Sequence, residues 1–164
     1  MLINNGILFS GTAGPSLPTA QDLGIAAAVA AGVTTARIAL LVAWPQFKDA
    51  TDTSNNQVLT PLSGPLDVGI VSVLHAIAEE LLFRGALVPA IYPDWRGVAI
   101  AGAVFGALHV NGGRNAAFGA WAGAVGCAYG AAFLATGNLL VPVLAHGVAN
   151  VASATVWLQS NENK

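Results

Sequence analysis

The stretch Leu74–Ala86 reads LHAIAEELLFRGA and places three ionisable side chains, Glu79, Glu80 and Arg84, among residues suited to lipid. The segments on either side are apolar, so a helix through this region carries these charges at or near membrane depth. A charged group at the centre of a bilayer costs about 2.5–3.5 kcal/mol or more unless it is paired or faces a polar cavity. We therefore expect these three residues to be paired or to serve a function.

The three charges face in different directions on a helix. Successive residues are turned by about 100°, so Glu79 and Glu80 do not share a face. Arg84 stands four residues after Glu80, the spacing at which an acid and a base meet. We expect Glu80 and Arg84 to form a supporting ion pair, which leaves Glu79 free to meet groups from other helices.

The composition is that of an integral membrane protein. Of the 164 residues, 55% are hydrophobic and 9% are charged, whereas about 25% of residues are charged in soluble domains. The net charge of −2 provides no basic surface for nucleic acid, so that partner is excluded. The single cysteine, Cys127, excludes an internal disulfide and lies in a run of small residues typical of a helix core.

The apolar segments predict an all-α, polytopic transmembrane bundle of about five helices with an intramembrane polar cavity. We expect helices at Leu23–Trp44, Asp67–Ala90, Gly97–Val110, Ala116–Thr136 and Leu139–Leu158. They form one membrane domain, residues 23–158, between a short irregular N-terminal segment, residues 1–22, and a polar tail, residues 159–164. Residues 46–66 are polar and contain prolines, which predicts an aqueous loop.

Two further features of the apolar segments bear on packing. Glycines recur four residues apart in the pairs Gly102/Gly106, Gly119/Gly123 and Gly126/Gly130. This spacing lets helix backbones approach closely in lipid. Arg37, near the C-terminal end of the first span, is expected to snorkel towards the interface or to pair with an acid in the bundle.

The last four apolar segments hold a short set of strongly polar residues: His75, Glu79, Glu80, Arg84, His109, His146 and Asn150. Phe105 and His109 are four residues apart, as are His146 and Asn150, so each pair faces one side of its helix. If both faces meet Glu79, one cavity holds a carboxylate, two imidazoles and a carboxamide. A glutamate and an imidazole can take a proton from water, and a second imidazole with Asn150 can donate hydrogen bonds to an oxyanion.

Other hydrolytic chemistries lack their residues. Ser72 and Ser153 have no flanking glycine turn of a serine elbow, and Cys127 has no histidine nearby in the sequence. The motif HExxH of helical zinc proteases is absent. His75 stands four residues before Glu79, where we expect it to tune that acid or to cap a polar path rather than to catalyse.

Three motifs, in this order, resemble those of the CAAX protease and bacteriocin-processing (CPBP) family, which includes the type II CAAX prenyl endopeptidases. They are EExxxR at Glu79–Arg84, FxxxH at Phe105–His109 and HxxxN at His146–Asn150. The resemblance covers about residues 59–158. It implies an intramembrane endopeptidase, historically classed as a metalloprotease, that hydrolyses peptide bonds of membrane-associated substrates such as prenylated CAAX-type proteins.

The resemblance also implies roles for the polar residues. Glu79 and His109 are expected to activate water, and His146 and Asn150 to stabilise the oxyanion. The supporting residues are Glu80, Arg84, Phe105 and His75. This glutamate mechanism requires no cofactor. The alternative is a zinc ion held by Glu79, His109 and His146.

The expected partners are the lipid bilayer and a peptide or lipidated-protein substrate, while the sequence leaves the oligomeric state open. The loops Gly112–Arg114 and Gly137–Pro142 are similar to those of cyanobacterial and plastid members, which predicts a plastid or photosynthetic membrane. Two other functions stay open: a scaffold or partner protein of the same fold that cuts nothing, and a proton-coupled carrier. The absence of paired broken helices in two matching halves argues against the carrier.

Overall fold

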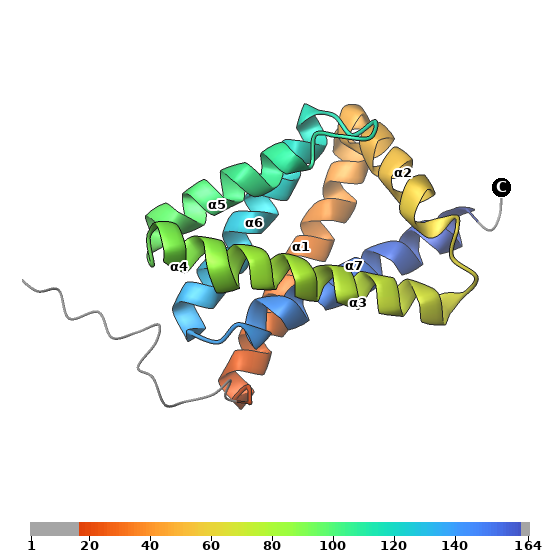
Figure 1. The fold of residues 1–164 in the computed structure, drawn as a ribbon. Helices are drawn as coiled ribbons and strands as arrows, with labels where there is room; N and C mark the ends of the chain where they lie inside the picture. Colours follow the sequence, from red (N-terminus) through yellow and green to blue (C-terminus); the bar gives the residue numbers. More distant parts are fainter. Residues whose placement is uncertain (1–16, 162–164) are drawn as a thin grey trace, which may run out of the picture.

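The computed structural model describes residues 17–161, and its regular structure in that range is helical (Figure 1). The elements are α1 (Ala20–Ala43), α2 (Pro45–Leu59), α3 (Pro65–Glu80), the π-helical segment η1 (Leu81–Leu87), α4 (Val88–Ile91), α5 (Trp95–Leu108), α6 (Ala116–Thr136) and α7 (Leu140–Asn161). All five predicted apolar segments are helical. The prediction of an all-α membrane bundle is confirmed.

The helices differ in how far they can reach across a bilayer. By length and composition, α1, α6 and α7 can each cross a membrane. Helix α5 is apolar but has 14 residues, so it falls short of a full span. Segments α3, η1 and α4 follow one another without a break, and residues 65–91 rise about 40 Å at 1.5 Å per residue.

The bundle is built from two sets of packed helices. Helices α5 and α6 lie side by side, while α1 and α3 both pack against α7 (Figure 1). Helix α6 also contacts α1 and α7, and thus joins the two sets. Large apolar side chains such as Leu74, Leu81 and Leu82 are exposed on the outer surface, where lipid would cover them.

Helix ends follow local chemistry. Thr19 and Asp22 form a capping box that begins α1, and the helix ends at Trp44, before Pro45. Asp94 caps α5 by accepting a hydrogen bond from the Arg96 amide. The hydrogen bonds from Arg96 hold the pKa of Asp94 below its usual value, so this cap remains ionised at neutral pH.

The prediction of an aqueous loop over residues 46–66 is wrong, because Pro45–Leu59 forms helix α2. Its buried residues include Phe47, Ala50 and Thr51, which recur at three- and four-residue spacing among polar neighbours. The Phe47 ring lies against the rings of aromatic residues on α6. Too few apolar residues mark this face for periodicity to reveal the helix, and packing on α6 stabilises it.

The predicted ends of the domain meet the structure only in part. Residues 159–161, assigned to a polar tail, continue α7. Residues 1–16 of the predicted N-terminal segment, and residues 162–164 of the tail, lie outside the described residues. Within the described part of that segment, α1 already begins at Ala20.

The helix predicted from Asp67 to Ala90 is not uniform. Immediately after Glu80 it widens into η1, where the Val88 amide donates to the Phe83 carbonyl, five residues earlier. Pro89 follows; it has no amide hydrogen, and its ring would clash with the carbonyl four residues before it in a regular helix. The wider turn relieves that clash. Such π-helical turns are frequent at functional sites.

Small residues allow α5 and α6 to touch backbone to backbone. A Cβ atom added at Gly106 would lie 2.6 Å from the Gly119 carbonyl oxygen and 3.1 Å from the Gly123 Cα atom. A Cβ atom at Gly102 would lie 2.5 Å from the Cys127 Sγ atom. The predicted close approach through four-spaced glycines is therefore present between these helices.

We predict that Gly106→Ala destabilises the bundle by about 1–3 kcal/mol, because the added methyl group meets backbone that cannot move aside. The measurement is the free energy of unfolding in detergent. Gly69→Ala on α3 is the matched control, since a Cβ atom there meets nothing within 4 Å. Equal stability of the two variants would show that the α5–α6 contact does not depend on glycine.

Candidate active site

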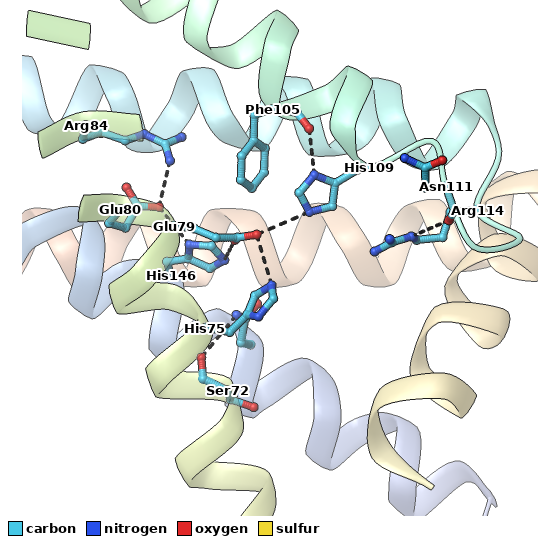
Figure 2. A network of polar contacts seen from close by, with 11 residues as sticks. Ser72, His75, Glu79, Glu80, Arg84, Phe105, His109, Asn111, Arg114 and His146 are labelled. Atoms are coloured by element: carbon cyan, nitrogen blue, oxygen red, sulfur yellow. Dashed lines mark hydrogen bonds and ion pairs between the residues drawn. The ribbon is translucent and has the colours of Figure 1, made fainter. Parts of the chain in front are cut away.

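The two adjacent glutamates have different surroundings (Figure 2). The Glu80 side chain is completely buried, whereas that of Glu79 is 17% exposed. Both lie at the C-terminal end of α3, before the π-helical turn. The helical rotation between neighbours directs Glu80 into the bundle and Glu79 into a cavity, as the sequence predicted.

Glu80 is the centre of a buried polar network. Its Oε1 atom accepts hydrogen bonds from Arg84 Nη1 at 2.9 Å and from His146 Nδ1 at 2.8 Å. Arg84 Nη2 donates to the Gly126 carbonyl at 2.5 Å. The predicted pairing of Glu80 with Arg84 is confirmed. The network joins α3, η1, α6 and α7.

Aromatic rings surround the buried guanidinium group. The Arg84 Cζ atom lies 5.9 Å from the centre of the Phe83 ring, 5.5 Å from that of Phe105 and 5.7 Å from that of Tyr129. Cation–π attraction of this kind strengthens when the cation is desolvated. Phe105, predicted to support the site, packs on Arg84 and on the ring of His109.

Glu79 faces three imidazole rings. Its Oε1 atom lies 3.1 Å from His75 Nε2 and 3.6 Å from His109 Nε2, and its Oε2 atom lies 3.7 Å from His146 Nε2. The three histidines come from α3, the end of α5 and α7. The structure thus brings together the acid and the two imidazoles that the sequence assigned to one cavity.

The hydrogen bonds of His109 define its tautomer. Its Nδ1 atom lies 2.7 Å from the Phe105 carbonyl oxygen, which can only accept, so Nδ1 carries a proton. When the ring carries this proton alone, it presents the Nε2 lone pair to Glu79. At 3.6 Å, two acceptors do not bond directly, and a water molecule between them can donate one hydrogen to each.

His146 connects the two glutamates. Its Nδ1 atom donates to Glu80, and its Nε2 atom faces Glu79 from the opposite edge of the ring. The bond to Glu80 therefore orients the ring so that Nε2 points towards Glu79. The Tyr129 ring stacks on His146 at 4.7 Å between centroids and limits its rotation.

Asn150 lies one turn after His146 on α7 and lines the same cavity. Its Nδ2 atom is 3.5 Å from the Ser72 carbonyl oxygen, at the limit of a hydrogen bond. Because this contact is weak, the side-chain amide of Asn150 can still donate a hydrogen bond to another oxygen.

One cavity of about 240 Å³ brings the predicted residues together. It is lined by Glu79, His75, His109, His146, Asn150 and Phe105. Glu80 and Arg84 are buried outside this lining. The side chain of His75 is 64% exposed, which places it where the cavity opens to the surroundings. The cavity is also lined by Arg37, Asn55 and Arg114, which sequence reasoning did not assign to it.

The zinc alternative concerns Glu79, His109 and His146 as possible ligands. Among residues 17–161, no group of three or more His, Cys, Asp or Glu side chains is arranged to hold a metal ion. His109 and His146 both use Nδ1 in hydrogen bonds to the protein, and the Nε2 atom of each faces Glu79, which is the usual orientation of histidine metal ligands. Zinc held by Glu79, His109 and His146 therefore stays an alternative prediction.

A family model described as type II CAAX prenyl endopeptidase Rce1-like matches residues 61–152. The chain belongs to this family. The match includes all three motifs and runs from the loop before α3 into α7, leaving α1 and α2 outside. Searches of curated proteins and of solved structures gave no match. Membership in the Rce1-like family confirms the predicted CAAX protease resemblance, whereas the similarity to plastid members stays a prediction.

We predict that Arg84→Met destabilises this Rce1-like protein by about 3–5 kcal/mol, because it leaves Glu80 as a buried acid without its cation. The free energy of unfolding in detergent measures the effect. Arg96→Gln is the control, since Arg96 and Asp94 form an exposed ion pair that solvent screens. The double variant Glu80→Gln/Arg84→Met should recover part of the loss. A single variant as stable as the native protein would contradict the supporting role.

Proposed function

We propose that this protein is an intramembrane endopeptidase of the glutamate type, in which Glu79 and His109 activate a water molecule. The observation that carries the proposal is the position of the Glu79 carboxylate, which meets His109 and His146 inside one cavity. Each imidazole is oriented by a hydrogen bond at Nδ1. A general base such as Glu79 needs neighbouring groups that the protein holds in position, and the two oriented imidazoles meet this requirement.

The proposed reaction begins with a water molecule between Glu79 and His109. Glu79 takes a proton as the water oxygen attacks the carbonyl carbon of the scissile peptide bond. The carbonyl oxygen becomes an oxyanion, which accepts hydrogen bonds from Asn150 and from protonated His146. Glu79 then returns the proton to the amide nitrogen, and the carbon–nitrogen bond breaks to release an amine and a carboxylic acid.

His146 requires its buried partner for this role. A neutral ring with the proton on Nδ1 has no hydrogen on Nε2 to donate to an oxyanion. The proposed mechanism therefore uses the form of His146 with a proton on both nitrogens, in which Nδ1 donates to the Glu80 carboxylate at 2.8 Å. His75 contacts Glu79 from the same helix and is assigned a positioning role at the cavity opening.

The substrates proposed are membrane-associated peptides and proteins, including prenylated CAAX-type proteins, in line with family membership. The bilayer is the second partner, because three helices can cross it. A plastid or photosynthetic membrane is proposed only on the similarity of two loops. The scaffold alternative keeps the same fold without cleavage, so it is decided by the experiment on Glu79.

We predict that Glu79→Gln lowers cleavage at least about 100-fold, since the base is lost. The measurement uses protein in lipid nanodiscs and a quenched fluorescent farnesylated peptide, together with a proteomic comparison of membranes carrying the native or variant protein. Asp67→Asn is the control on the same helix, because Asp67 accepts from the Ser63 amide outside the cavity. Absence of cleavage by the native protein in both assays would favour the scaffold.

The metal question has its own test. We predict that prolonged dialysis against a chelator leaves the cleavage rate of the native protein within about twofold, because the proposed base acts without a metal. Zinc is then added back to the dialysed sample. A large loss of activity that zinc restores would replace the glutamate mechanism with the zinc alternative.

A further inference from the structure

Most basic side chains in the described part of the chain are paired with acids. Three of the five form ion pairs, namely Lys48–Asp52, Arg84–Glu80 and Arg96–Asp94. Arg37 and Arg114 form no ion pair among residues 17–161. Both line the cavity that contains Glu79. Of the two alternatives expected for Arg37, snorkelling or pairing with an acid, the second is not found in the described residues.

The two unpaired guanidinium groups come from different parts of the fold. Arg37 lies on α1 and also lines a second cavity beside the first. Arg114 lies in the loop between α5 and α6, where its Nε atom donates to the Asn111 carbonyl at 2.9 Å (Figure 2). That bond involves a single nitrogen and no negative charge. The rest of the guanidinium group is available for an anion.

A third donor lies in the same cavity wall. The Nδ2 atom of Asn55, on α2, is buried and has no hydrogen-bond partner within the described structure. Asn55 lines both cavities, as Arg37 does. Buried donors almost always have acceptors, so an amide nitrogen of this kind indicates that a ligand supplies one.

Asp52 lines the second cavity with Arg37 and attracts its charge, but both carboxylate oxygens of Asp52 are bonded to other side chains. Its Oδ2 atom is bonded to Lys48, and its Oδ1 atom accepts from Trp157. Glu79 is the only carboxylate lining the first cavity within the described range, and it faces histidines.

We propose that Arg37, Arg114 and Asn55 form an anion subsite that binds the terminal carboxylate of a peptide substrate. The assignment to a peptide rests on the proposed function, because the same cavity holds Glu79. A CAAX-type substrate ends three residues after the scissile bond, which places its carboxylate within about 10 Å of that bond. Arginine suits this ligand because its planar guanidinium group binds carboxylates through two parallel hydrogen bonds.

The subsite extends the site beyond the family match. Arg37 and Asn55 lie on α1 and α2, outside residues 61–152, whereas Arg114 lies within them. The helices that precede the matched segment thus contribute to substrate selection. They also give the cavity a positive wall that complements a negatively charged chain end.

The test measures peptide binding without cleavage. Glu79→Gln protein in phosphatidylcholine nanodiscs is titrated with a fluorescent S-farnesyl Cys-Val-Leu-Ser peptide that ends in either a carboxylate or an amide. The carboxylate form should bind at least about tenfold more tightly, the scale of a charged hydrogen bond. Arg37→Gln and Arg114→Gln, each added to this background, should weaken binding of the carboxylate form and leave the amide form unchanged.

Controls separate the subsite from general charge effects. Arg96→Gln removes a basic residue outside the cavity and should keep the preference for the carboxylate. Equal affinity for the two peptides overturns the proposal, and so does a preference that survives both arginine substitutions. Phosphatidylglycerol in the nanodisc provides a third test. If it displaces both peptides to the same extent and they bind equally, the wall binds lipid phosphate, which also overturns the proposal.

The binding result is independent of the proposed reaction. A preference for the carboxylate that depends on the arginines supports the subsite even if the native protein cleaves nothing. Conversely, cleavage with equal binding of both peptides retains the proposed function and removes the subsite. The comparison of carboxylate and amide peptides needs no further substitution, so a variant that fails to fold does not prevent the test.

Discussion

The fold depends on the buried pairing of Arg84 with Glu80. A guanidinium group sealed from water is tolerated only when its charge and its donors are satisfied. Here the carboxylate comes from α3, and the second acceptor is a backbone carbonyl of α6, only 2.5 Å from Nη2. A Cβ atom at Gly126, the residue that supplies this carbonyl, would lie 3.4 Å from the same nitrogen. The pairing therefore determines how closely α6 can approach the continuous helix formed by α3 and η1.

The same network orients His146 beside Glu79, the candidate catalytic base. His146 donates to Glu80 from one nitrogen and faces Glu79 with the other, so the position of the structural acid sets that of the imidazole beside the reactive one. Adjacent glutamates on one helix can thus have opposite roles. Their separation depends on the rotation of about 100° per residue, and the π-helical turn begins only after both.

Features set by local spacing were predictable from the sequence, and features set by distant packing were not. The pair Glu80–Arg84 follows from four-residue spacing, and the close contact of α5 with α6 follows from four-spaced glycines. Convergence of Glu79, His109 and His146 was expected because charge within apolar segments requires partners. Helix α2 was missed because its polar exterior hides a narrow buried face. The positions of Arg37 and Asn55 depend on α1 and α2 meeting the cavity, which no local pattern encodes.

Helix α2, which the sequence did not predict, explains how the loop between α5 and α6 can lie beside the cavity. Helix α5 ends at His109, and the chain then turns through Gly112 and Gly113, both with positive φ. Exposed peptide groups at membrane depth need partners from protein or from a water-filled cavity. Helix α2 supplies them, since the Gln57 side chain donates to the Gly112 carbonyl at 2.6 Å. At the other end of the loop, Asn115 donates to the Gln46 carbonyl at 2.8 Å. By contacting the loop at Gly112 and at Asn115, α2 constrains the position of Arg114 between them.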